Sequence, residues 1–407
     1  MTKKIIIFFA LGNVIYAQSL INQYIFSPDK NKISPDTTKQ LFDNYQYKKN
    51  YFEKVRLSAD FSEFSDIESE YAVRLYPKSS SEMKLEKSNY NLKKEQLENQ
   101  YGSKDIKDLK QKYETILAAH YEYKLLQNIE SMMEVYKSGI KSIKNNIQNS
   151  SDIENLSSIS DKLETLKLIH FQKKHQYKNT LSKIKLNLTD ANIEDIEFEI
   201  QNSQVFSADK IIELMLQNNY EETIGNSSSD QNNLYQSKLL ENKLALKKIK
   251  DSITLESVEL KYDDSKRTNK NLSLGLHVEI PLGESNNMDI INTKLKMLSL
   301  KNKISSTKIL TNYKVSKIIE DIKFLHTYNQ NIQKQSIEKQ SFYKKYTKLE
   351  KLNSKFLVNL KKKNIEYKKD MITTDYQLHK KYLDFLYETN TLCCNAPTNK
   401  IFYQSEE

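Results

Sequence analysis

The chain has 407 residues, a formal net charge of +10 and a mean hydropathy of −0.71. It contains no Trp, only 6 Gly and 5 Pro, and 29% charged residues. A polar chain with so few turn-forming residues predicts long helices rather than an ordinary globule. The positive charge is spread through the predicted helices without an aromatic and basic motif, which argues against nucleic acid as a partner.

The first residues have the pattern of a secretory signal peptide. A basic start, "MTKK", precedes the apolar run "IIIFFAL", and "VIYAQ" follows, so we expect a signal peptide over residues 1–17 with cleavage after Ala17. The alternative, a first helix of the mature fold, fits a short isolated apolar run less well. No later segment has the unbroken apolar length of a membrane-spanning helix, so entry into a membrane requires a barrel.

A first repeat is predicted over residues 18–200. After a polar lead, "SPDTTKQLFDNYQYKKNYFEK" at residues 34–54 has the start signal of a short helix. Alternating apolar and polar residues then predict two strands over about 54–62 and 70–77, the second ending at a proline.

A long helical hairpin follows over about 84–188. Its apolar residues form a narrow, coiled-coil-like stripe, which suits helix-on-helix packing. The stripe breaks at "NIQNSSDIEN", where Ser151 or Asp152 can cap the second helix. Residues 188–206 are then predicted to be a linker.

A second repeat is predicted over residues 201–392, beginning with a helix capped by Ser207. Strands are expected over about 255–263 and 271–282, and a helical hairpin over about 289–392, followed by a tail at 393–407. Landmarks of the two repeats share one offset: Pro77 and Pro281, Asn149 and Asn353, and Leu188 and Leu392 are each 204 residues apart. The fold class is therefore mainly α with β, built from two copies of a β-hairpin plus a long antiparallel helical hairpin.

Each predicted strand has one apolar and one polar face. Two isolated hairpins of this kind leave unpaired edges, so copies from several subunits are expected to close into a barrel. In a membrane barrel the apolar face meets lipid and the polar face a water-filled lumen. The lipid-facing set is then Leu272, Leu274, Leu276, Val278 and Ile280, and the lumen-facing set Arg56, Arg74, Glu259, Lys261, His277 and Glu279. The alternative is a small soluble sheet packed on the helices.

The segments "SADKIIELMLQNNYEE" and "NLSLGLHVEIPLGES" with its following helix, repeated around "EYAVRLYP", resemble the TolC-like outer-membrane efflux protein family. The resemblance implies four strands per subunit in a trimeric outer-membrane β-barrel, continued by an α-helical barrel tunnel in the periplasm. It implies an outer-membrane exit duct of a tripartite efflux pump or a type I secretion system. A periplasmic adaptor protein, an inner-membrane transporter and outer-membrane lipid would be its partners.

In that family the tunnel closes at the periplasmic tips of the helical hairpins, which correspond here to residues 149–156 and 352–357. The second tip is basic where well-known members are acidic, and the first tip carries two acids. We expect a gate in which acids of one hairpin pair with lysines of the next, made by Asp152, Glu154, Glu350, Lys351 and Lys355. Solvated turn charges are the alternative, because exposed pairs contribute about 1 kcal/mol or less each.

Two other functional classes are alternatives to a duct. An exported periplasmic coiled-coil scaffold or adaptor would explain the helices and the charge but not the duplicated β-hairpins. An enzyme is not expected, because no catalytic triad order, metal-ligand spacing or glycine-rich phosphate loop stands out. His175 and His379 are expected to be structural or exposed, Cys393 and Cys394 cannot join distant segments, and no cofactor is expected.

Overall fold

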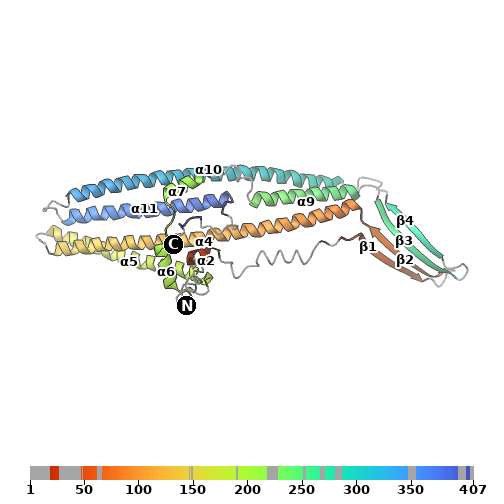
Figure 1. Ribbon diagram of the computed structural model, residues 1–407, viewed down its shortest axis with the longest axis horizontal. Helices are drawn as coiled ribbons and strands as arrows, with labels where there is room; N and C mark the ends of the chain where they lie inside the picture. Colours follow the sequence, from red (N-terminus) through yellow and green to blue (C-terminus); the bar gives the residue numbers. More distant parts are fainter. Residues whose placement is uncertain are drawn as a thin grey trace, which may run out of the picture. The chain divides into compact units, whose positions relative to one another are not determined.

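The structure is a computed structural model that describes residues 19–26, 47, 49–61, 67–145, 147, 150–188, 191–217, 228–250, 254–265, 271–279, 287–346, 354–392 and 400–403. The chain divides into two compact units. Unit 1 comprises Met1–Lys32, Lys104–Gly225 and Thr311–Glu407, and unit 2 comprises Ile33–Ser103 and Asn226–Leu310. Two long helices, α4 (Ser80–Lys144) and α10 (Asn287–Tyr346), contribute residues to both units (Figure 1). The predicted signal peptide and the two cysteines lie outside the described residues.

Unit 2 contains one antiparallel sheet of four strands in the order β1-β2-β3-β4. The sequence predicts two separate hairpins, and in the structure the pairing of β2 with β3 joins them into one sheet (Figure 1). The strands are β1 (Phe52–Phe61), β2 (Ile67–Pro77), β3 (Thr254–Ser265) and β4 (Asn271–Glu279). The predicted first helix is wrong at its end, because Phe52 to Lys54 pair with β2. Most of that helix lies outside the described residues.

The helices of unit 2 are α9 (Ser228–Lys250) and the first parts of α4 and α10. The amide nitrogen of Asn242 on α9 donates hydrogen bonds to Oγ of Ser88 (3.0 Å) and Oδ1 of Asn89 (2.9 Å) on α4. On α10, Oδ2 of Asp289 lies 2.7 Å from Nζ of Lys247. Polar contacts therefore hold α9 to both of its neighbours.

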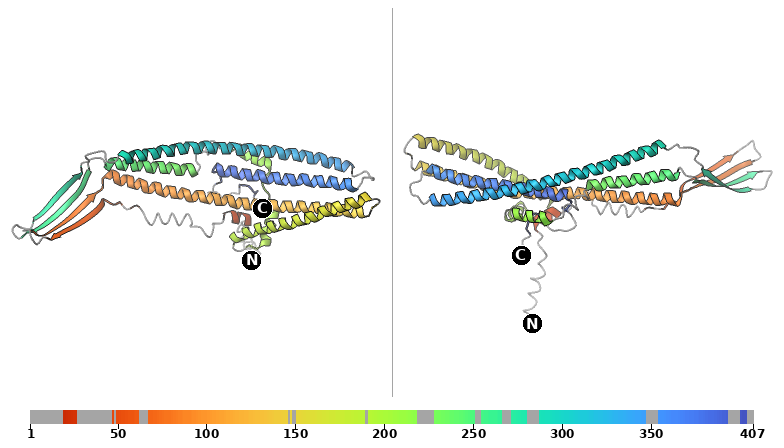
Figure 2. Two further views of the ribbon diagram at one scale, coloured as in Figure 1. Left: turned by 180° about the vertical axis from the view of Figure 1, so that it is seen from behind. Right: turned by 90° about the horizontal axis from the view of Figure 1, so that it is seen from above.

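Unit 1 contains two helical hairpins. One is formed by α4 with α5 (Ser150–Asn187), and the other by α10 with α11 (Ser354–Glu388), as the two views of Figure 2 show. Helix α5 begins at Ser150, so the predicted caps Ser151 and Asp152 lie inside its first turn. An acidic residue there stabilises the helix through a favourable interaction with its dipole. Across the described part of the chain, no helix has a stretch long and apolar enough to cross a membrane.

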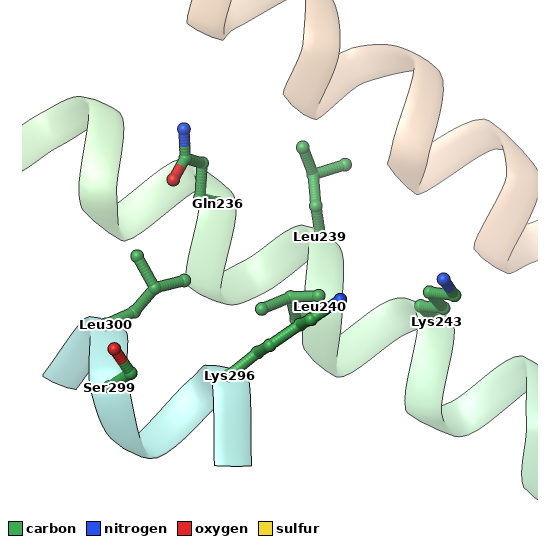
Figure 3. Close-up of a pocket in the computed structure, with 7 residues that line it drawn as sticks. All are labelled: Gln236, Leu239, Leu240, Lys243, Lys296, Ser299 and Leu300. Carbon is green, nitrogen blue, oxygen red and sulfur yellow. The ribbon is translucent and has the colours of Figure 1, made fainter. Parts of the chain in front are cut away.

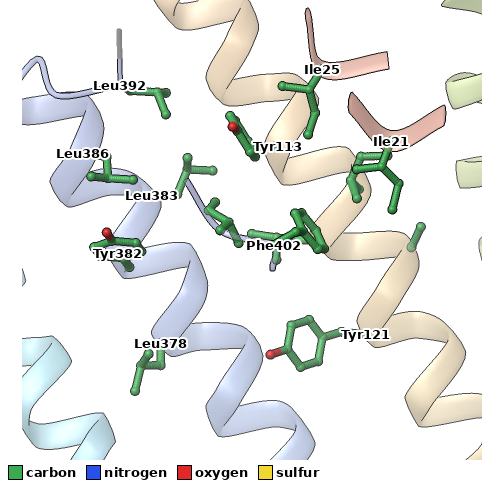
Figure 4. Close-up of a cluster of buried hydrophobic side chains, with 14 of the residues drawn as sticks. Ile21, Ile25, Tyr113, Tyr121, Leu378, Tyr382, Leu383, Leu386, Leu392 and Phe402 are labelled. Carbon is green, nitrogen blue, oxygen red and sulfur yellow. The ribbon is translucent and has the colours of Figure 1, made fainter. Parts of the chain in front are cut away.

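The main core of unit 1 lies where α4 and α11 meet, around aromatic and aliphatic side chains that are almost fully buried (Figure 4). The end of the chain reaches this core as well. Although residues 393–407 are predicted to be a tail, Phe402 is 3% exposed and bridges to Val205, and the backbone N of Phe206 donates to O of Ile401 at 2.8 Å. Part of the predicted tail is therefore structural.

Two short helices of unit 1 differ from the predictions. The predicted linker 188–206 contains α6 (Ile193–Asn202), which buries Ile196 and Ile200 on one face. The predicted polar lead contains α2 (Leu20–Phe26), whose N-terminal amides are bound by Glu199 of α6 at 2.6 Å (Leu20) and 3.1 Å (Ile21). Helices of two or three turns carry too few apolar positions to give a clear periodicity, so their signal was missed.

The helix α7 (Ala208–Gln217) agrees with the prediction. The backbone N of Lys210 donates to Oγ of Ser207 at 3.2 Å, which is the predicted cap. Ile211 and Met215 on its inner face are buried in the core of unit 1.

Candidate functional site: a two-faced sheet and the ends of two helical hairpins

The strand register places the alternating residues of all four strands on common faces. Arg56, Arg74 and Glu259 are successive partners across β1, β2 and β3. Each apolar residue likewise lies beside apolar partners, for example Leu260 between Val73 and Leu274. Because a shift of one residue would mix the two faces, this register gives the sheet one continuous apolar face and one continuous polar face.

The apolar face is exposed in the single chain. Leu57 is 74% exposed, and Leu274 on β4 is 69% exposed. Leaving one leucine side chain in water forgoes about 1.5–3 kcal/mol relative to burying it, so a continuous face of this kind marks a contact surface. Its exposed members are Val55, Leu57, Tyr71, Leu255, Leu260, Leu272, Leu274, Leu276 and Val278. These include four of the five predicted lipid-facing residues, and the fifth, Ile280, lies outside the described residues.

The polar face carries a network of charges across the strands. Glu259 on β3 accepts from Nη2 of Arg74 at 2.8 Å, and its second oxygen lies 2.9 Å from Nε2 of His277. Nζ of Lys261 lies 2.9 Å from Glu70 and 3.4 Å from Asp263. The structure therefore brings four of the six predicted lumen-facing residues into cross-strand ion pairs or hydrogen bonds.

The other two predicted lumen-facing residues lie at the edges of the sheet. Arg56 is exposed on β1, beside Arg74 in the register. Glu279 is the last residue of β4, and its side chain is outside the described set. The network of charges therefore lies on the two inner strands and β4.

A groove of about 470 Å³ lies between α9 and α10 in unit 2 (Figure 3). Leucine side chains form its apolar part, and Figure 3 shows the side chain of Lys296 extending toward Leu240, with Lys243 farther along α9. The lining residues are Gln236, Leu239, Leu240, Lys243, Lys296, Ser299 and Leu300, which together contain no carboxylate, imidazole or thiol. The groove offers apolar and cationic contacts and no acid–base pair.

The predicted tip residues are only partly placed. Asp152 is half-buried in the first turn of α5, and Glu154 is exposed two residues later. Lys355 lies in the first turn of α11, but its side chain is not described, and Glu350 and Lys351 fall outside the described residues. The predicted pairing of acids with lysines across the hairpin ends is therefore untested.

The two helical hairpins of unit 1 contact each other closely. An added Cβ on Gly139 of α4 would stand 2.6 Å from Cγ2 of Val358 on α11. Farther along the same two helices, the side-chain amide of Asn128 donates to O of Ile365 at 3.0 Å. Sequence reasoning passed over these residues, although a glycine inside a long helical pattern is itself a signal of close packing.

Sequence reasoning also missed a buried polar cluster in the core of unit 1. Nδ1 of His379 lies 3.0 Å from the hydroxyl of Tyr121, and Nε2 lies 2.8 Å from O of Phe206. His120 places Nδ1 3.0 Å from Oγ of Ser203. Burial lowers the pKa of His120 to about 4 and also lowers the pKa of His379, so both rings are neutral at pH 7.

His120 and His379 are both buried in this cluster. His175, by contrast, is exposed on α5. Among the residues that the structure describes, no group of three His, Cys, Asp or Glu side chains is arranged to hold a metal ion.

No protein-family model and no curated protein matches this sequence. Solved structures do match it over most of the chain. The outer membrane protein VceC from Vibrio cholerae is 7% identical with a TM-score of 0.65, and the match covers 91% of this chain and 95% of VceC. The CmeC outer membrane channel from Campylobacter jejuni is 12% identical with a TM-score of 0.62, covering 92% and 86%. The MtrE outer membrane channel from Neisseria gonorrhoeae, in its open state, is 10% identical with a TM-score of 0.64, covering 91% and 87%.

These likenesses confirm the predicted resemblance at the level of the fold. The chain has the fold of TolC-like outer-membrane efflux channels, with its small antiparallel sheet and its long helices. The agreement extends over both units, because each match covers about nine-tenths of the chain. At identities this low the likeness concerns the fold alone.

Proposed function

We propose that this chain is the outer-membrane exit duct of a tripartite efflux pump or a type I secretion system. The observation that carries the proposal is the sheet, which exposes a continuous apolar face and has an ion-paired polar face opposite. A lipid-facing surface and a wet lumen require this division of side chains. The fold shared with outer-membrane channels supports the same role.

Three copies would complete the barrel. Within the described chain, β1 and β4 each have one edge without a partner strand, and four strands are too few to close. Pairing β4 of one copy with β1 of the next would satisfy both edges. Exposed apolar side chains on α10, among them Leu295, Leu298 and Tyr313, would be covered by the neighbouring copy in the helical part of the assembly.

The duct itself would perform no chemistry. Cargo would pass passively through the helical tunnel in the periplasm, and an inner-membrane transporter, joined by a periplasmic adaptor protein, would supply the energy. The hairpin ends would form the gate, with Asp152 and Glu154 pairing with Lys351 or Lys355 of an adjacent hairpin. Export through the signal peptide would bring the chain to the outer membrane.

A charge placed on each face of β4 tests the lipid-facing assignment. Leu274→Arg puts a cation on the apolar face, where a lipid contact would make it cost about 2–4 kcal/mol near the bilayer centre. Ser273→Arg puts the same charge on the adjacent, polar face and is the matched control. We expect the wild type and S273R to stay in the outer-membrane fraction after a high-salt wash, and L274R to be depleted from it. Equal retention of both variants would contradict the assignment.

A further inference from the structure

The two helical hairpins differ sharply in charge at their ends. Residues 334–370 of the α10/α11 hairpin contain twelve lysines and four acidic residues, a net charge of +8. The segment 204 residues earlier, 130–166 of the α4/α5 hairpin, contains four lysines and six acidic residues, a net charge of −2. Most of the net charge of the chain therefore resides at one hairpin end.

The described lysines of that end lie on two helices that pack against each other. The two helices lie side by side. Oδ1 of Asn364 on α11 accepts a hydrogen bond from Nε2 of Gln340 at 3.3 Å and lies 3.5 Å from Oγ of Ser336, both on α10. The charges of both helices therefore contribute to one local positive potential. We call the described exposed lysines the basic end; they are Lys334, Lys339, Lys361, Lys363, Lys368 and Lys369.

The hairpin does not neutralise this charge by itself. Lys362 pairs with Glu366 at 3.3 Å, whereas no carboxylate in the described part of the chain lies within ion-pair distance of the lysines of the basic end. Unpaired like charges on one surface repel each other and raise the local potential. Such a surface attracts an acidic partner.

A second copy of this chain cannot supply enough negative charge. If the hairpins alternate around a ring, each basic end faces an α4/α5 end of −2, which leaves about six positive charges per subunit. A membrane surface also fits poorly. Helices that bind lipid surfaces offer a continuous apolar face beside their lysines. Here Val358 and Ile365 of α11 are buried, and among the described side chains of the segment Ile337 of α10, at 67%, is the one strongly exposed large apolar residue.

We propose that the basic end of the α10/α11 hairpin is the docking surface for an acidic polypeptide segment. The inference deepens the proposed function, because it names the chemistry of the partner that joins the duct at its hairpin ends. Complementary charge of this kind steers association and sets which partner binds, and its effect falls with ionic strength. The adjacent α4/α5 end, with its net charge of −2, is not expected to bind such a segment.

Binding of poly-L-glutamate to the full-length mature protein in detergent micelles tests the proposal. One variant reverses three lysines of the basic end, Lys361→Glu, Lys363→Glu and Lys368→Glu. The matched control reverses three exposed lysines of the other hairpin, Lys137→Glu, Lys141→Glu and Lys162→Glu, with the same change in net charge. We expect the first variant to weaken binding about tenfold or more and the control less than about twofold, with binding of the wild type falling steeply as salt rises.

Equal losses in the two variants would overturn the proposal, because they would show a response to total charge only. No binding of the polymer by the wild type would overturn it too. Vesicles of phosphatidylglycerol that bind the wild type while poly-L-glutamate does not would assign the surface to a membrane instead. Channel formation is measured separately, so a protein that binds the polymer but forms no channels would refute the duct and leave the docking surface intact.

Discussion

Gly139 of α4 lies directly against Val358 of α11, so closely that an added Cβ would stand 2.6 Å from Cγ2 of the valine. Both residues are buried, and the valine belongs to the small apolar cluster between the two hairpins of unit 1. The contact sets how near the hairpins approach each other. A side chain at this position must move either the stiff valine or a helix.

The first prediction follows from that contact. Gly139→Ala raises helix propensity by about 1 kcal/mol, but overpacking in a close contact costs about 1–3 kcal/mol. Because β-branched Val358 cannot rotate away freely, we expect the overpacking to prevail and the midpoint of thermal unfolding to fall. The double variant Gly139→Ala with Val358→Ala removes the clash and is expected to recover part of the loss. A single variant more stable than the wild type would contradict the close contact.

The second prediction concerns pH. His120 has a pKa of about 4 in the folded chain, below the ordinary value of 6.5, because its ring is buried. The unfolded chain therefore binds more protons between these values, and the free energy of unfolding falls as pH drops from about 6.5 to 4, by roughly 2–3 kcal/mol from this group. His379 acts with the same sign, whereas burial raises the pKa of Asp375 and opposes it.

Comparison of two variants isolates His120. We expect His120→Gln to flatten the acid side of the stability profile, measured by chemical denaturation from pH 7 to pH 4. His175→Gln, at an exposed position on α5, is the control and is expected to keep the wild-type profile. Identical profiles for the two variants would show that His120 does not titrate as its burial implies.

The third prediction concerns the charges on the polar face of the sheet. Glu259 pairs with Arg74 at 2.8 Å, and both side chains are partly exposed, so loss of the pair should change stability by about 1 kcal/mol or less. In a water-filled duct the same charges set ion selectivity. We expect Glu259→Gln to move the reversal potential in a salt gradient toward anion selectivity, and Arg74→Gln to move it toward cation selectivity. Shifts of the same sign would contradict a lumen-facing position.

The fourth prediction concerns the proposed gate. In the proposed gate, Asp152→Lys with Glu154→Lys would place like charges against Lys351 and Lys355 of the adjacent hairpin. Because each exposed pair contributes about 1 kcal/mol or less, the effect requires several pairs around the ring. We expect a higher open probability in single-channel recordings, reversed when Lys351→Glu and Lys355→Glu are added. An unchanged open probability in the first variant would remove these residues from the gate.

The long helices and the strands could be predicted because their patterns are repeated many times along the chain. Alternation over β3 and β4 identified both faces of the sheet, since the side-chain period of a strand is two. The short helices α2 and α6 could not be predicted in this way. Their few apolar residues, such as Ile21 and Ile196, give no clear helical period, and these helices are stabilised by the tertiary contacts that bury those residues.

The sequence predicts which residues of one strand share a face. It does not predict contacts between segments that are far apart in the chain. The alternation of apolar and polar residues could be read from the sequence of each strand, but the pairing of Arg74 with Glu259 joins strands almost two hundred residues apart. The contact between Gly139 and Val358 likewise depends on the packing of two helices from different hairpins. Periodicity within one segment contains no information about such partners.

The measurement that tests the central claim most directly is conductance across a planar bilayer by the purified mature protein, reconstituted from detergent. A trimeric exit duct predicts discrete, charge-selective channels. A protein that stays soluble without detergent and is electrically silent in the bilayer would contradict the duct, and the sheet would then be an ordinary contact surface of an exported scaffold.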